Sequence, residues 1–324
     1  LSLEGLPRPE RLALTWPRDT APPAGWRATV ACGLPPGRLT GQPIRLPDFL
    51  GLGVQRSGST WLYHVLGASP GIALGPVKEL HFFERYYGRR WTSRLEDSEA
   101  FQRRRERGTA PEAGAATRTW WAAYDALPRE ARDWLWYAEL FGALPEAAAV
   151  GEITPQYALL PAACVGEIAD RLPDLKAFVT LRDPLARAWS QLFLFVRQHE
   201  IDPATLTPEA MLAILRRPSV LTHGNYRRLL RTTWGALLPP ERLRVQFYDD
   251  LPADPQAYRD ALLGFLLPGA PPPRDAPPPA ERPRLGLRPP DAVRDCLAAH
   301  YAPQLAWLRQ HFGAKIAGWG RPWD

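Results

Sequence analysis

The sequence contains few cysteines, and they lack the patterns in which cysteine usually stabilises a fold. Only Cys32, Cys164 and Cys296 occur in 324 residues, far apart and without a CxxC spacing. An odd number of widely spaced cysteines predicts neither a disulfide framework nor a zinc site. No other cluster of metal-ligating residues stands out, so we expect no bound metal. This composition favours a reducing compartment, the cytoplasm.

Long hydrophobic runs are also absent from the sequence. No window approaches the roughly 18 apolar residues of a membrane span, so we expect no membrane partner. The first residues do not have the pattern of a signal peptide. The apolar content of 45% nevertheless allows a sizeable core. Without an internal repeat or a clear boundary, a chain of this length is expected to form one large α/β domain.

Lysine is scarce in a chain that is otherwise basic. Only Lys78, Lys176 and Lys315 occur, although lysine and arginine together number 40. Such a bias, with abundant alanine and proline, is typical of a GC-rich bacterial genome and makes each lysine a candidate for a specific role. The net charge of +6 suits an anionic ligand. No nucleic-acid-binding motif occurs, so we do not expect a nucleic-acid partner.

The most informative stretch is 49–62. A short apolar run predicts a buried strand, a Gly- and Ser-rich turn follows, and apolar residues then recur at helical spacing. In such a unit the backbone N–H groups and the helix dipole favour an anion. Residues 53–60 fit the frame of a phosphate-binding P-loop, except that Ser59 replaces the lysine of nucleotide triphosphatases. An ordinary strand–turn–helix with tightly packed glycines is the alternative.

Strands alternate with helices along the rest of the chain. This alternation predicts an α/β fold, a single domain whose central parallel sheet is flanked by helices. The N-terminal arm of 1–46 is rich in proline and arginine, and the domain is expected over 47–324. Further strands are expected at 72–74, 148–152, 176–181 and 243–248, and helices at 130–142, 208–217, 224–238, 254–266 and 290–312, with a Pro-rich loop at 268–283.

A second anion site is predicted where the strand 176–181 ends. Asp183 suits a helix N-cap and Pro184 the first helical position, so Arg182 lies at the carboxyl end of the strand, where open α/β sheets bind ligands. An arginine fork and the hydroxyl of Ser190, two turns on, can hold a phosphate. Alternatively, the arginine caps carbonyl groups. Together the two anchors indicate a nucleotide with phosphate groups at two positions, such as an adenosine 3′-phosphate that carries a 5′-phosphosulfate.

These residues resemble the motifs of the sulfotransferases. Residues 55–61 (QRSGSTW) look like the 5′-phosphosulfate loop, and residues 182–190 (RDPLARAWS) look like the 3′-phosphate motif. Residues 78–83 and 151–157 resemble segments of the heparan-sulfate type, the first of which carries a catalytic Glu. The resemblance covers roughly 48–318. It implies transfer of a sulfuryl group from 3′-phosphoadenosine 5′-phosphosulfate (PAPS), with adenosine 3′,5′-bisphosphate (PAP) as product.

The resemblance also implies roles for individual residues. Glu79 is expected to be the base, since a carboxylate near aromatic residues can have a raised pKa. Arg56 is expected at the leaving oxygen and Lys78 at the sulfate, with His81 as the alternative base. The expected cofactor-binding residues are Gln55, Arg56, Ser57, Gly58, Ser59, Thr60, Trp61, Arg182, Ser190 and Arg288.

The acceptor is less well defined by the sequence. We expect a small-molecule alcohol or phenol, and a glycan stays open because of the motif type. Ile153 stands where glycan-sulfating relatives tend to have lysine, which disfavours a polyanionic glycan. The Arg-rich stretch 84–140 is expected to present a solvated helix face, with an acceptor lid as the alternative. Tyr86, Trp91 and Tyr157 could line an acceptor pocket, although core positions are favoured.

Two other classes of protein stay open at this point. The first is a P-loop kinase or nucleotide triphosphatase, which the serine at position 59 disfavours. The second is a non-catalytic module that binds polyanions through the Arg-rich stretch. Neither O- versus N-sulfation nor the oligomeric state can be inferred from the sequence.

Overall fold

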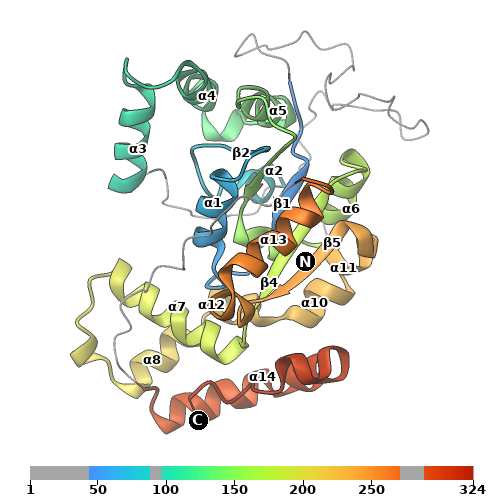
Figure 1. The fold of residues 1–324 in the computed structure, drawn as a ribbon. Coiled ribbons are helices and arrows are strands. Elements are labelled where there is room, and N and C mark those ends of the chain that lie inside the picture. Colours follow the sequence, from blue (N-terminus) through green and yellow to red (C-terminus); the bar gives the residue numbers. More distant parts are fainter. Residues whose placement is uncertain (1–43, 88–95, 97, 271–287, 324) are drawn as a thin grey trace.

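The computed structural model describes residues 44–87, 96, 98–270 and 288–323. Most of the expected N-terminal arm, most of the Pro-rich loop and Trp91 therefore lie outside the described residues. The strands are β1 (Phe49–Gly51), β2 (Ile72–Leu74), β3 (Ala149–Ile153), β4 (Lys176–Leu181) and β5 (Leu243–Phe247). They form one parallel sheet in the order β2-β3-β1-β4-β5, which confirms the expected α/β class (Figure 1).

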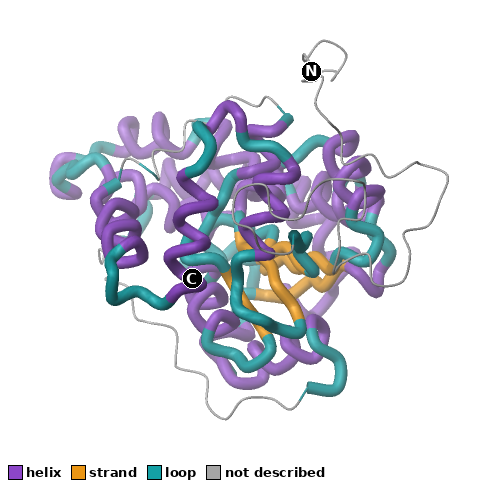
Figure 2. Tube along the Cα trace, turned by 90° about the horizontal axis from the view of Figure 1, so that it is seen from above, coloured by secondary structure: helices purple, strands orange, loops and turns teal. Residues whose placement is uncertain are grey.

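Helices surround this sheet, and they are joined by short 3-10 turns (Figure 2). The longer helices are α1 (Ser59–Gly67), α3 (Glu99–Thr109), α4 (Ala115–Asp125), α5 (Trp134–Gly142), α6 (Ala162–Arg171), α7 (Pro184–Gln198), α8 (Pro208–Leu215), α13 (Pro255–Leu266) and α14 (Asp291–Phe312). The shorter helices are α2 (Phe82–Tyr86), α9 (Pro218–Leu221), α10 (Tyr226–Arg231), α11 (Trp234–Leu237) and α12 (Asp250–Ala253).

The two faces of the sheet carry separate hydrophobic cores. On one face, Phe49 and Phe178 pack with apolar residues of α1 and α13. On the other face, Leu50 and Val179 belong to a larger core that includes α5, α6, α7 and α14. Burial on both faces explains why the strands read as nearly continuous apolar runs in the sequence.

The parallel strands all end at the same edge of the sheet, and this positions the candidate site. β1 leads into the Gly-rich loop and β4 into Arg182. β2 ends shortly before Lys78 and Glu79, and β3 ends at Ile153. Open α/β sheets bind ligands at this edge, because the connecting loops converge there.

The expected helix over 224–238 is interrupted, which gives the separate helices α10 and α11. Thr232 donates its hydroxyl to the carbonyl of Arg228 at 2.8 Å, and Thr233 donates to the carbonyl of Leu229 at 3.2 Å. Threonine hydroxyls that bond nearby carbonyl groups compete with the helical pattern, and Thr233 has a non-helical backbone.

The Arg-rich stretch forms α3 and α4. The carboxylate of Glu96 connects this region to neighbouring parts of the protein through hydrogen bonds. Glu96 accepts hydrogen bonds from Arg85 at 3.3 Å, from Arg132 at 3.0 Å and from Arg129. The Tyr124 hydroxyl donates to the same carboxylate at 2.7 Å. Burial raises the pKa of Glu96, but Tyr124 and the arginines outweigh this effect and lower the pKa to about 2.

We expect Glu96→Gln to destabilise the protein at neutral pH and to matter less in acid. The folded protein holds the pKa of Glu96 below its ordinary value of 4.5, so the carboxylate stabilises the fold fully above that value. This contribution is lost as the pH falls toward 2. At pH 7 the variant should lose about 2 kcal/mol of unfolding free energy, measured by urea denaturation. Glu99→Gln, on the exposed face of α3, is the control, and an equal deficit of Glu96→Gln at every pH would contradict the account.

Candidate functional site

The Gly-rich loop between β1 and α1 has the backbone of an anion-binding turn. Gly58 is the N-cap of α1 and no side chain caps this helix, so its first N–H groups are directed at the loop. Gly58 has φ +83°, and a Cβ there would lie 2.8 Å from Leu251, so only glycine fits. Ser57 is buried, and its hydroxyl has no hydrogen-bond partner among the described residues. These features fit an anion that accepts hydrogen bonds from the loop.

Arg182 lies beside this loop, as the sequence predicted. Its Nη1 donates to the carbonyl of Arg56 at 2.7 Å, and its guanidinium lies 4.4 Å from the centre of the Tyr248 ring. The Tyr226 hydroxyl donates to the carbonyl of Arg182 at 2.7 Å. These contacts hold both the backbone and the guanidinium of Arg182 at the carboxyl edge of the sheet.

The two predicted anchors meet through Arg56. This residue has φ +69°, and its Nε donates to the hydroxyl of Ser190 at 3.0 Å. Residues separated by 134 positions in the chain therefore come together at one place. Arg56 reaches the second anchor, whereas the sequence placed it only at the first.

Glu79 lies in a cluster of charged residues. Lys78 forms an ion pair with it, and the Nε2 atom of His81 lies 3.6 Å from its other oxygen. Burial raises the pKa of Glu79, but the positive charges of Lys78 and His81 outweigh this effect and lower the pKa to about 2. The expectation of a raised pKa was therefore wrong, because these neighbouring cations stabilise the carboxylate.

His81 connects Glu79 to a second carboxylate. Its Nδ1 lies 3.1 Å from Glu84, which is buried. Burial lowers the pKa of His81, but the two carboxylates outweigh this effect and raise the pKa to about 9. The imidazole is therefore protonated at neutral pH, which disfavours its predicted role as the alternative base.

Glu152 holds the segment that carries Glu79 against the sheet. Its carboxylate accepts hydrogen bonds from the hydroxyls of Tyr137 at 2.5 Å, Tyr157 at 2.8 Å and Thr154 at 2.7 Å. It also accepts a bond from the backbone N–H of Leu80 at 3.3 Å. Sequence reasoning did not find this centre, because Leu80 and Tyr137 lie far from Glu152 in the chain. Tyr157 is fully buried here and belongs to the core.

The start of α7 is held by a contact with the C-terminal part of the described chain, at Gly320. The sequence did not predict this contact. Asp183 caps α7, as predicted, and its Oδ1 accepts from the N–H groups of Leu185 and Ala186. Its other oxygen accepts from the N–H of Gly320 at 2.6 Å. Residues near the end of the described chain thus help to position the helix that carries Ser190.

The other expected site residues differ in their placement. Trp61 packs edge-on against Tyr258, with ring centres 6.1 Å apart. Gln55, Ser59 and Thr60 are half-buried in or beside the loop. Arg288 is exposed, and no described hydrogen bond or ion pair joins it to these residues.

The described residues contain neither a metal-binding cluster nor a helix that could span a membrane. No group of three or more metal-ligating side chains is arranged to hold a metal ion in this part of the chain. Within the same residues, no helix combines the length and the apolar character that crossing a membrane requires.

Comparisons with known proteins agree with the motifs. The model of the sulfotransferase family matches residues 47–267. A comparison with curated proteins gave no match. A solved sulfotransferase from Alicyclobacillus acidocaldarius is 22% identical, with a TM-score of 0.55 over 86% of this chain and 100% of that one. This similarity shows the same fold.

Two further structures are more distant. The sulfotransferase domain from the curacin biosynthetic pathway is 21% identical, with a TM-score of 0.45 over 68% of this chain and 74% of that one. Mouse sulfotransferase SULT7A1 complexed with PAP is 16% identical, with a TM-score of 0.40 over 71% of this chain and 62% of that one.

Proposed function

The chain belongs to the sulfotransferase family, and we propose that it transfers the sulfuryl group of PAPS to the hydroxyl of a small-molecule acceptor. The contact between Arg56 and Ser190 carries this proposal, because it joins the Gly-rich loop to the predicted 3′-phosphate anchor. A nucleotide with phosphate groups at both its 5′ and 3′ positions fits two such anchors. ATP has no 3′-phosphate to occupy the second.

The residues of the site suit this cofactor. The uncapped start of α1 and the hydroxyl of Ser57 can donate hydrogen bonds to the 5′-phosphosulfate. Arg182 and Ser190 can bind the 3′-phosphate, since an arginine fork matches phosphate geometry. Arg56 lies between the two positions, so it can also stabilise the charge that develops on the leaving oxygen.

We propose an in-line displacement at sulfur with Glu79 as the base. The acceptor oxygen forms the new S–O bond, the bond from sulfur to the 5′-phosphate oxygen breaks, and the acceptor proton moves to Glu79. In this mechanism Lys78 binds the sulfuryl oxygens and weakens its ion pair with Glu79. Loss of that cation raises the pKa of Glu79 and makes it a stronger base.

His81 has a supporting role in this proposal. Its protonated ring lies between Glu79 and Glu84, so it can hold the base in place without accepting the acceptor proton. Glu79 and His81 have positive φ angles of 66° and 53°, which non-glycine residues adopt rarely. Strain of this kind persists where the surrounding structure fixes the residue, here through His81 and Glu152.

The compartment and the acceptor are also part of the proposal. Among the described residues Cys296 is a free thiol, which agrees with a reducing cytoplasm. An alcohol or phenol is the acceptor we expect, with a glycan as the alternative.

A direct assay of transfer tests the reaction. The protein is incubated with PAPS and a panel of alcohols, phenols and glycans, and mass spectrometry follows the sulfate ester and PAP. We expect equal amounts of the two products with at least one acceptor. A phosphate ester formed from ATP under the same conditions, with no sulfate ester from PAPS, would favour a kinase instead.

A further inference from the structure

The arginines of α3 differ in whether they have a partner. Arg103 pairs with Glu99 at 2.9 Å, and both side chains are mostly exposed. Arg105 pairs with Asp125 of α4 at 2.8 Å. Arg104 is half-buried, and within the described part of the chain it has neither an ion-pair nor a hydrogen-bond partner. An arginine in this position, without a carboxylate partner, is available to bind an anionic group of a ligand.

Arg104 faces inward because the packing of α3 fixes the rotation of the helix. Phe101 and Gly108, three residues before it and four after it, are buried on the same helical face. Phe101 packs against the ring of Trp121, with ring centres 5.5 Å apart. A Cβ at Gly108 would lie 2.0 Å from Trp121, so α3 and α4 are in close contact there.

The pair of helices α3 and α4 packs on the turn at Gly75. This turn leads to Lys78 and Glu79, which we call the catalytic segment. A Cβ at Gly75 would lie 2.9 Å from the ring of Trp120 in α4. The hydroxyl of Tyr63 in α1 donates to the carbonyl of the same Gly75 at 2.6 Å. Lys78 and Glu79 follow three and four residues later. The turn is therefore held between α1 and α4, beside the start of the catalytic segment.

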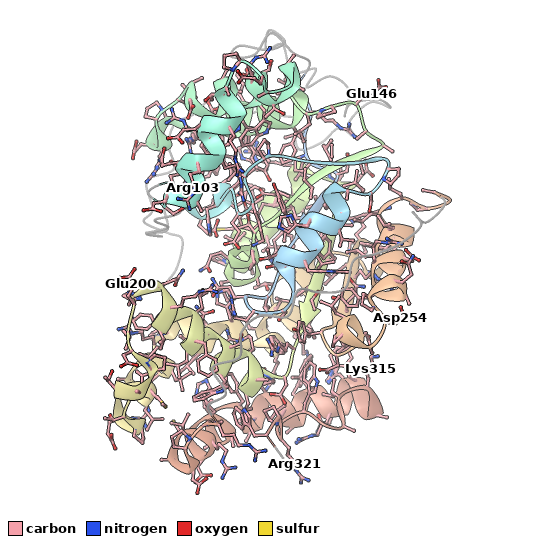
Figure 3. The ribbon with its side chains drawn as sticks, turned by 60° about the vertical axis from the view of Figure 1, so that its left-hand side comes forward. Arg103, Glu146, Glu200, Asp254, Lys315 and Arg321 are labelled. Atoms are coloured by element: carbon pink, nitrogen blue, oxygen red, sulfur yellow. The ribbon has the colours of Figure 1, made fainter. Side chains whose placement is uncertain are left out.

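The charge of Arg104 reaches this turn. Burial raises the pKa of Tyr63, and Arg104 opposes that effect, which places the guanidinium in electrostatic range of the Tyr63 hydroxyl. Figure 3 shows Arg103, the neighbour of Arg104 in sequence, on the same side of the molecule as Glu200 at the end of α7.

We infer that Arg104 binds an anionic group of the acceptor, so that the preferred acceptor is a hydroxy compound that also carries a carboxylate or a similar group. This inference rests on the proposed sulfuryl transfer, with the hydroxyl at Glu79 and the anion at Arg104. A guanidinium binds a carboxylate through two parallel N–H···O bonds, which gives orientation as well as affinity. The Arg-rich helix then forms one wall of the acceptor site, while Arg103 and Arg105 keep their partners.

Binding of matched ligands to the PAP-saturated protein tests the inference. The probes are phenols with a carboxyalkyl chain of increasing length, each compared with its carboxamide, and titration calorimetry gives the affinities. For at least one length, we expect the acid to bind the wild type roughly tenfold to a hundredfold more tightly than its amide. Arg104→Ala should remove this preference and leave the affinity of the amide unchanged.

Control variants separate a specific contact from general charge. Arg103→Ala removes an exposed arginine one position away and should keep the preference for acids. Arg104→Gln serves if Arg104→Ala does not fold, and it should lose the preference in the same way. If no acid binds the wild type better than its amide, or if Arg104→Ala keeps the preference, the inference is wrong. The affinity for PAP, measured in a separate titration of the unliganded protein, tests the proposed function independently.

Discussion

Glu79→Gln is expected to lower kcat by about a factor of 10² to 10⁴, the usual contribution of a positioned base. Glutamine preserves the size of the side chain but cannot accept the acceptor proton. No described hydrogen bond or ion pair joins Glu79 to Arg56 or Arg182, so the affinity for PAP should change little. Initial rates of PAPS turnover and titration calorimetry with PAP measure the two quantities.

The control for this variant is Glu99→Gln, which changes an exposed carboxylate on α3. It should leave both the rate and the affinity for PAP unchanged. Because the pKa of Glu79 is about 2, the wild type should not lose activity near neutral pH through protonation of this base. A Glu79→Gln enzyme with most of its activity would show that another group accepts the proton.

Arg182→Ala is expected to weaken the binding of PAP by roughly tenfold to a hundredfold, the usual effect of removing a charged hydrogen-bond donor. Arg182 is held at the sheet edge by the carbonyl of Arg56 and the ring of Tyr248. If it binds the 3′-phosphate, the loss should be specific to nucleotides that carry this group.

Binding of AMP tests whether the effect of Arg182→Ala depends on the 3′-phosphate. AMP lacks the 3′-phosphate, so its affinity should be almost the same for the wild type and for Arg182→Ala. Arg216→Ala, a substitution of an exposed arginine that follows α8, is the control and should preserve the preference for PAP over AMP. An unchanged affinity of Arg182→Ala for PAP would exclude the 3′-phosphate role.

Much of the fold could be predicted from local patterns. The strands β1, β2 and β4 are short, mainly apolar runs that end at or just before glycine or a charged residue, and Asp183 with Pro184 marks the start of α7. The helix α3 was harder to predict from the sequence. Its inner face carries arginine and glycine and only one aromatic residue, Phe101. Such a face gives little of the hydrophobic periodicity that predicts a helix.

The site could be predicted only where one segment carries the signal. The loop at 53–60 and the Arg182 motif could be recognised because their residues are consecutive. The role of Glu152 could not, because Tyr137 and Leu80 meet it only in the folded chain. The low pKa of Glu79 is explained by residues that are its neighbours in sequence, because the positive charges of Lys78 and His81 outweigh the effect of burial.

Ligand-dependent thermal stability tests the central claim most directly, namely that the site binds a nucleotide through both its 5′- and its 3′-phosphate. The melting temperature is measured with PAP, with AMP and with ATP plus magnesium at equal concentrations. A ligand at a hundred times its Kd stabilises the folded state by about 2.7 kcal/mol. We expect a large increase with PAP, a smaller one with AMP and the smallest with ATP plus magnesium, because only PAP carries both phosphates. An equal or larger increase with ATP plus magnesium, or none with PAP, would contradict this claim.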